Sequence, residues 1–399
     1  MRASHRSGLL PLQQRERAHK IRSAHYTMLD DKSEKSELQS GVKECARNHS
    51  KLLALSFFAF LVFASSVIYI TSSPQFAIYS TSYLTVPDNN PVPTLEDLIQ
   101  DYVDSIKMEP INLKIGSTQF NYNMTVPRNK SECDGVEMVV YSMTMNDKDS
   151  FHRRQTIRQI ISKTTNRSVL FRFFIGDNKK DEFMSLAAEM MKYNDIVYYD
   201  HIETYRENYV KWYSMHEYHM KYCPNVKHFV KMDDDVTADF GRVFEWLDVG
   251  FDGFTSNGSE YFLCHGMYGY YPLRNKGSDW YVPESEFPEP NWPTYCYGYF
   301  IITTNDTVKL ISETMKDMNL VHMDDAFITG IVRRNTTIPL LNWPGICSEP
   351  DEIDYEKCSL NGKIPTVIAL HNTKDRKATK DWIETIRKIN CNNTDFLQL

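Results

Sequence analysis

A short apolar run, Phe229–Met232, leads directly into three consecutive carboxylates, Asp233, Asp234 and Asp235. The run predicts a buried strand, and three adjacent like charges repel one another and cannot continue inside it. We therefore expect them at the carboxyl end of the strand, where open α/β sheets bind ligands and a divalent cation would neutralise them. Oxygen ligands suit Mg²⁺ or Mn²⁺, whose remaining positions are commonly filled by phosphate oxygens and water. For these three residues alone, a solvated acidic turn is the alternative.

Strands and helices alternate around this acidic segment and would position it. Before it, apolar runs predict strands at 138–143, 169–176 and 196–199, and helical patterns lie between them at 154–162, 181–192 and 206–222. After it, we expect helices at 306–318 and 324–332, a strand at 366–370 and a helix at 379–389. This alternation predicts an α/β fold with a largely parallel sheet and helices on both faces. We expect residues 250–300, rich in Gly, Pro and aromatics, to form strands and loops over the site rather than core.

Residues 52–70 are nineteen uncharged and mostly apolar residues, enough helix to cross a thin bilayer. Arg47 and Lys51 precede them and no charge follows until Asp88, so the positive-inside rule places the N-terminus in the cytosol. A cleaved signal peptide and a buried core helix are the alternatives; the fifty preceding residues and the apolar surface on all faces disfavour them. We expect a cytosolic tail at 1–51, an anchor at 52–70, a stem at 71–134 and a folded lumenal body at 135–399.

Charge and cysteine usage agree with a lumenal body. The chain carries a net charge of −7, and the part after residue 70 carries −12, which argues against nucleic acid as a partner. Seven of the eight cysteines fall after the apolar segment, so at least one is free or paired between chains. Cys347 and Cys358 are close enough for a local bridge, but the connectivity stays open. Seven glycosylation sequons also fall there, at Asn123, Asn129, Asn166, Asn257, Asn305, Asn335 and Asn392.

Four ordered motifs between residues 135 and 390 resemble glycosyltransferase family 31, which contains β1,3-galactosyl- and β1,3-N-acetylglucosaminyltransferases and the Fringe enzymes. HRRQTIR at 152–158 is similar to the family's RRxAIRxTW, and Asp200 with YRENYVK at 205–211 is similar to D-x-x-D-x-Y-x-N-L-T-x-K. KMDDDV at 231–236 matches K-x-DDDV, and MDDAFITG at 323–330 is similar to EDV[YF]-x-T-G.

The resemblance implies a GT-A fold for residues 135–399 and a single-pass type II protein of the Golgi membrane. It implies an inverting transferase that moves galactose, or an N-acetylhexosamine, from a UDP-sugar to the 3-hydroxyl of an acceptor glycan on a glycoprotein or glycolipid. Mn²⁺ or another divalent cation is the implied cofactor. The alternatives are an inactive relative, serving as a lumenal glycan-binding module or chaperone, and a metal-dependent phosphodiesterase, whose His clusters are missing. Donor sugar, acceptor and a homodimer stay open.

The resemblance also assigns roles to residues. Asp233 and Asp235 would bind the metal; His371, just after the last strand, would be a further ligand, although a lone His is more often structural. Asp325 would be the general base, with Asp324 raising its pKa, although carboxylates at a helix start are also favourable with the helix dipole. Arg154 and Arg158 lie four residues apart and share one helix face, which the resemblance assigns to nucleotide binding. Without the resemblance, a solvated basic face would be the simpler interpretation. The implied nucleotide-binding residues are Arg154, Arg158, Asp200, Lys211, Asp233 and Asp234.

The sequence departs from the family at three positions. Residues 293–301 align on P-P-Y-C-S-G-G-G-Y, with Tyr299 and Phe300 in place of two glycines, and Ile161 stands where the motif has Trp. Since bulky residues prevent the close backbone approach that glycine permits, we expect a reshaped sugar pocket. The aromatic residues nearby suit stacking on sugar faces, but are as often simple packing: Trp280, Tyr281, Trp292, Tyr295 and Tyr297.

Overall fold

The computed structural model describes residues 93–178, 183–255, 258–352, 358, 362–389 and 391. The predicted cytosolic tail and membrane anchor lie outside these residues. Within them, no helix is both long and apolar enough to cross a bilayer.

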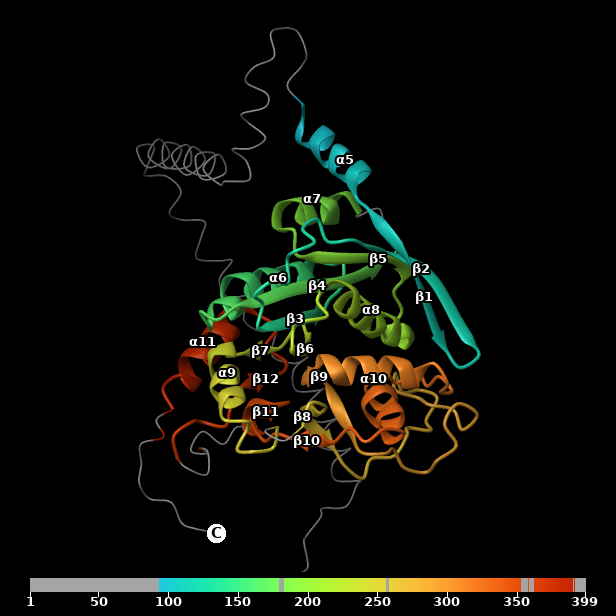
Figure 1. The fold of residues 1–399 in the computed structure, drawn as a ribbon, viewed down its shortest axis with the longest axis vertical. Helices are drawn as coiled ribbons and strands as arrows, with labels where there is room; N and C mark the ends of the chain where they lie inside the picture. The colour runs from blue at the N-terminus through green and yellow to red at the C-terminus, as the bar shows by residue number, and fades with distance from the viewer. Residues whose placement is uncertain are drawn as a thin grey trace, which may run out of the picture. The chain divides into compact units, whose positions relative to one another are not determined.

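In the described part of the chain, a nine-stranded sheet has the order β1-β2-β5-β4-β3-β6-β9-β8-β10 (Figure 1). Its four middle strands run parallel: β5 (Ile196–Ile202), β4 (Val169–Asp177), β3 (Met138–Met143) and β6 (His228–Asp233). Antiparallel pairs flank them, β1 (Met108–Ile115) and β2 (Thr118–Thr125) on one side, β9 (Tyr295–Thr304) and β8 (Phe262–Met267) on the other. β10 (Leu340–Asn342) pairs parallel to β8. The predicted α/β class with a parallel centre is therefore confirmed.

Helices cover both faces of this sheet (Figure 1). One core contains α6 (Lys148–Gln159), α7 (Phe183–Tyr193) and α9 (Phe240–Asp248), together with α5 (Leu95–Ser105). The other contains α8 (Asn208–Tyr222), α10 (Asn305–Met315) and a π-helix, η3 (Ala326–Val332). Every residue of β3 is buried, with Met138 and Val140 in one core and Val139 and Tyr141 in the other. Such a strand reads as one continuous apolar run because both of its faces are covered.

A smaller three-stranded sheet carries the C-terminal part of the chain. Its order is β11-β12-β7, from β11 (Ile346–Cys347), β12 (Ala369–Leu370) and β7 (Thr237–Ala238). Because β7 follows the acidic end of β6 by only a few residues, this sheet brings the residues after β12 next to that end. The terminal helix α11 (Arg376–Ile386) packs on α6. The remaining short helices are η1 (Ile161–Lys163), η2 (Tyr205–Glu207) and η4 (Pro350–Glu352).

The folded body begins earlier than predicted. β1 and β2 form a hairpin whose β2 pairs with β5, and Leu113 and Ile115 are fully buried, although we expected a stem up to residue 134. The two strands are joined by Gly116 and Ser117, with Gly116 at a φ of +55°, as tight hairpin turns require. The expectation of a spacer is therefore wrong for residues 95–125.

β9 corrects a second expectation. Residues 295–300 were expected in strands and loops over the site rather than in the core, but they belong to a ten-residue strand between β6 and β8 in the main sheet. Tyr299 and Phe300 are both buried. The expectation that this stretch lies outside the core is therefore wrong for these two residues.

Three disulfides join described cysteines: Cys133–Cys223, Cys264–Cys296 and Cys358–Cys391. A local bridge from Cys347 to Cys358 is therefore wrong, and Cys347 is the one free thiol in the described part, buried in the smaller sheet. Disulfides persist in oxidising compartments, so this pattern supports a secretory-pathway protein.

Candidate active site

The structure brings together the three predicted metal ligands. Asp233 ends β6, Asp235 follows two residues later, and His371 follows β12. Their ligand atoms all lie within 4.8 Å of one another, with His371 Nε2 3.3 Å from Asp235 Oδ1. Thr373 N donates to the Asp235 carbonyl over 2.9 Å and thereby holds the two segments together. Two carboxylates and an imidazole form a donor set that suits Mn²⁺. That they bind it stays a prediction.

Positively charged or hydrogen-bonding groups lie against these carboxylates. Lys231 Nζ lies 2.6 Å from Asp233 Oδ1 and donates to the Gly298 carbonyl, also over 2.6 Å. Burial acts to raise the pKa of Asp235, but the hydrogen bond and charge of His371 outweigh it, and the net shift is downward. Ionised carboxylates are what a divalent cation requires.

Asp234 has protein partners of its own. Its carboxylate accepts hydrogen bonds from the Thr144 hydroxyl over 2.6 Å and from Arg153 Nε over 2.8 Å. Burial raises its pKa, and the Arg153 charge and these hydrogen bonds oppose the rise. Its expected role in nucleotide binding stays a prediction. Arg153, to which we assigned no role, is the arginine of the 152–158 motif that reaches the acidic segment.

Arg154 and Arg158 have carboxylate partners within the protein. Arg154 has 1% of its side chain exposed, and its Nε and Nη2 lie 2.9 and 2.6 Å from the two Glu189 carboxylate oxygens. Its Nη1 donates to the Met145 carbonyl over 2.7 Å. Arg158 bonds Glu189 and Asp195. Carboxylates of the protein thus pair with both guanidinium groups, and Arg154 also supports the loop after β3. The expected contact of these two arginines with the nucleotide stays a prediction.

Lys211 supports the same loop from the other side. Its Nζ donates to the Thr144 carbonyl over 2.5 Å and lies 2.6 Å from Glu203 Oε1, and 5% of its side chain is exposed. Asp200 accepts from the backbone and side-chain amides of Asn123 in β2, over 2.6 and 2.8 Å. Both residues therefore have structural partners within the protein, and their expected nucleotide contacts stay predictions. Glu203, which sequence reasoning missed, stands three residues after Asp200, where the family motif has its second Asp.

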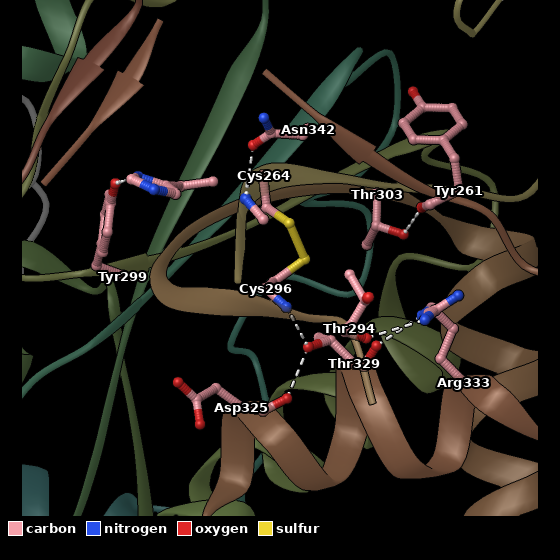
Figure 2. Close-up of a disulfide and its surroundings, with 12 residues drawn as sticks. Tyr261, Cys264, Thr294, Cys296, Tyr299, Thr303, Asp325, Thr329, Arg333 and Asn342 are labelled. Carbon is pink, nitrogen blue, oxygen red and sulfur yellow. Dashed lines mark hydrogen bonds between the residues drawn. A yellow bond between two sulfur atoms is a disulfide. The ribbon is translucent and has the colours of Figure 1, made fainter. Parts of the chain in front are cut away.

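Asp324 and Asp325 immediately precede η3. The Thr329 hydroxyl donates to the Asp325 carbonyl over 2.6 Å and accepts from Cys296 N over 2.8 Å, which links this turn to the Cys264–Cys296 disulfide (Figure 2). A Cβ added to Gly298 would lie only 3.1 Å from Asp325 Cβ, so glycine lets β9 pass this close. This contact explains the retained glycine at a position whose neighbour, Tyr299, is bulky.

The environment of Asp325 suits a general base. Burial, and then the charge of Asp324, raise the pKa of Asp325 to about 7. Burial also raises the pKa of Asp324, and the charge of Asp233 adds to this, whereas Lys231 opposes it. A base is most effective when its pKa lies near the working pH.

A cavity of about 440 Å³ opens beside these carboxylates, lined by Tyr205, Arg206, Ser278, Asp279 and Trp280. Trp280 Nε1 donates to the Tyr205 hydroxyl over 2.7 Å, and both rings are more than half exposed. Burial, and then the charges of the nearby carboxylates of the site, raise the pKa of Tyr205.

The other aromatic residues singled out in the sequence behave differently from Trp280. Trp292 and Tyr295 are buried, and the ring of Trp292 stacks on Phe287 with centroids 4.4 Å apart. Tyr297 keeps 36% of its surface exposed. Of this aromatic stretch, Trp280 therefore offers the clearest open stacking surface.

The comparisons with known proteins relate the chain to glycosyltransferases. Residues 152–344 match the family model described as Galactosyltransferase. This match, over slightly less than half of the chain, confirms the resemblance to glycosyltransferase family 31 seen in the sequence.

Several curated relatives are similar to the chain. Acetylgalactosaminyl-O-glycosyl-glycoprotein beta-1,3-N-acetylglucosaminyltransferase of Mus musculus is 26% identical over 190 residues, 45% of this chain and 47% of that protein. Beta-1,3-galactosyltransferase 1 of Homo sapiens is 24% identical over 243 residues, 60% of this chain and 71% of that protein. Lactosylceramide 1,3-N-acetyl-beta-D-glucosaminyltransferase of Mus musculus is 23% identical over 230 residues, 55% of this chain and 60% of that protein. The chain thus spans about half the length of the first.

The buried ion pair under the site generates a stability prediction. Replacing Glu189 by Ala leaves the Arg154 charge buried without its carboxylate, which typically costs about 3–5 kcal/mol. We expect Glu189→Ala to lower the unfolding midpoint in urea strongly.

Asp381→Ala is the matched control, because Asp381 pairs with Lys377 on an exposed helix face. Such pairs contribute little, so its midpoint should stay at the wild-type value. Equal midpoints for the two variants would show that the Arg154–Glu189 pair does not support the fold.

Proposed function

We propose that the chain is a metal-dependent β1,3-glycosyltransferase of GT-A fold. It transfers galactose, or an N-acetylhexosamine, from a UDP-sugar to the 3-hydroxyl of an acceptor glycan on a glycoprotein or glycolipid. One observation carries the proposal: at the carboxyl end of β6, a cluster of metal-type ligands lies in the same site as a carboxylate with a pKa of about 7. The family match supports the reaction class.

The reaction follows from these two parts of the site. A divalent cation held by Asp233, Asp235 and His371 would supply positive charge opposite the diphosphate of the donor. Asp325 accepts the proton of the acceptor hydroxyl, and the resulting nucleophilic oxygen forms a bond to the anomeric carbon. The bond from this carbon to the phosphate oxygen breaks at the same time, and UDP leaves with its electron pair. A single displacement inverts the configuration, so an α-linked donor gives a β-linked product.

The cavity at Trp280 is the proposed acceptor site. Its two exposed rings, Trp280 and Tyr205, offer apolar faces for a sugar ring, and Asp279 and Arg206 can bond hydroxyl groups. Burial, and then the charges of Asp324 and Asp325, raise the pKa of Tyr205. This effect supports a short distance between Tyr205 and Asp325. An acceptor stacked there would have a hydroxyl within reach of the base.

We further propose the Golgi lumen as the place of action, with the chain anchored as a type II protein through residues 52–70. The three disulfides support an oxidising compartment, and the uncharged segment with preceding basic residues supports the orientation.

The decisive test is turnover by the purified full-length chain with UDP-Gal, UDP-GlcNAc and UDP-GalNAc, with and without Mn²⁺. We expect one donor to be used only in the presence of metal. Asp235→Ala and Asp325→Asn should each reduce the rate by a factor on the order of 10² or more, because one removes a metal ligand and the other the base. Asp381→Ala, far from the site chemistry, is the matched control.

UDP binding without turnover on any donor and a broad acceptor array would contradict the proposal. It would favour the inactive relative, a glycan-binding module or chaperone.

The pKa of Asp325 predicts a pH dependence. Because the base must be ionised, kcat/KM should rise with pH and level off above about 7. The raised pKa also means that ionising Asp325 destabilises the folded state as the pH rises through about 7. Asp325→Asn should therefore abolish transfer and yet raise the melting temperature at pH 8. A melting temperature unchanged by this substitution would contradict the raised pKa.

The acceptor site predicts a selective effect of Trp280. Trp280→Ala should raise the acceptor KM about tenfold, the equivalent of about 1.4 kcal/mol of lost stacking, and leave donor hydrolysis unchanged. Tyr271→Ala is the control, since Tyr271 is similarly exposed but does not line the cavity. A change in donor KM instead would assign the cavity to the donor sugar.

A further inference from the structure

Tyr299 lies directly against the predicted metal ligand His371. Their rings stack with centroids 4.6 Å apart and planes 9° from parallel. β9 pairs with β6 as far as Phe300 and Met232, so Tyr299 is the next residue toward the strand end that carries Asp233. Tyr299 is 2% exposed. Its buried ring therefore covers one face of the His371 imidazole.

The Tyr299 ring is itself held in place. Its hydroxyl donates to the Ile346 carbonyl in β11 over 3.2 Å and lies 3.0 Å from His265 Nδ1. β11 is the strand that pairs with β12, directly before His371. The tyrosine thus connects β9 with the sheet that carries the histidine.

His371 lacks the usual means of orienting a metal-binding histidine. The second ring nitrogen of such a residue generally donates to a carboxylate or a carbonyl, which fixes the ring. His371 Nδ1 is buried, and within the described residues it has no hydrogen-bond partner, whereas Nε2 faces Asp235. The stack on Tyr299 is the contact that can fix the imidazole plane instead.

We infer that Tyr299 is a positioning residue, which holds the His371 imidazole by stacking so that Nε2 points into the metal site with Asp233 and Asp235. This inference rests on the metal site of the proposed function. It gives the departure from the family glycine a role: the ring substitutes for a hydrogen bond to Nδ1. The constraint comes from the flat ring, and the hydroxyl serves to anchor it.

The test measures Mn²⁺ affinity of the purified full-length chain without turnover, by the electron paramagnetic resonance signal of free Mn²⁺. Tyr299→Leu removes the flat ring and should weaken Mn²⁺ binding about tenfold, at the lower end of effects seen for orienting partners. Tyr299→Phe keeps the ring and should bind within about twofold of wild type. Tyr299→Met, with a flexible chain that fills the space, replaces the Leu variant if that one does not fold.

A double-mutant cycle separates positioning from general stability. If Tyr299 acts through His371, Tyr299→Leu should have no further effect on Mn²⁺ affinity in the His371→Ala background. Phe300→Leu is the matched control: Phe300 replaces the neighbouring glycine but is buried against Phe240, so it should lower the melting temperature and leave Mn²⁺ affinity unchanged.

The outcomes are distinguishable. Wild-type affinity in both Tyr299→Leu and Tyr299→Met, or an undiminished loss in the His371→Ala background, would overturn the positioning role alone. Failure of the wild-type chain to bind Mn²⁺ would overturn the metal half of the proposed function, and this inference with it.

Discussion

Carboxylates gathered at one end of a parallel sheet must be neutralised, and this constraint organises the site. Lys231 pairs with Asp233, Arg153 with Asp234 and His371 with Asp235. Asp324 and Asp325 have no salt-bridge partner among the described residues, and burial raises the pKa of both. Asp235 and Asp325 show the two outcomes of Coulomb energy and desolvation: the partner of Asp235 lowers its pKa, whereas burial of Asp325 without a partner raises its pKa. The same cluster can thus contain cation ligands and a base.

Two further buried cations, Arg154 and Lys211, support the loop that lies next to the acidic cluster. Arg154 and Lys211 bond the backbone of residues 144–145 from opposite sides, and each is paired with a buried carboxylate. Removing such charges from water is costly, so they persist only where an opposite charge and hydrogen bonds compensate for the loss of water. The loop they hold carries Thr144, which in turn bonds Asp234. These cations therefore contribute to the site through its geometry.

The two aromatic residues at family glycine positions differ in what they do. Phe300 enters the core beside Phe240, whereas Tyr299 lies under His371. Gly298 is retained because β9 passes within van der Waals contact of Asp325 there, where a side chain has no space. Two neighbouring residues of β9 are thus constrained by the site: Gly298 by Asp325, and Tyr299 by His371. A large side chain at position 299 is compatible with the acidic cluster because its ring packs against His371.

Local pattern in the sequence was enough for the fold class, for the acidic end of β6 and for a histidine after the last strand. Alternating apolar runs report burial of neighbouring residues, and like charges in sequence must leave the core wherever the strand lies. Only the tertiary structure decided which charges neutralise which: the partners of Arg154 and Arg158 lie more than thirty residues away, on α7 and just after it. It also decided the cysteine pairing, the place of β1 and β2 in the sheet, and the stack of Tyr299 on His371. These depend on packing between distant segments, which no local periodicity encodes.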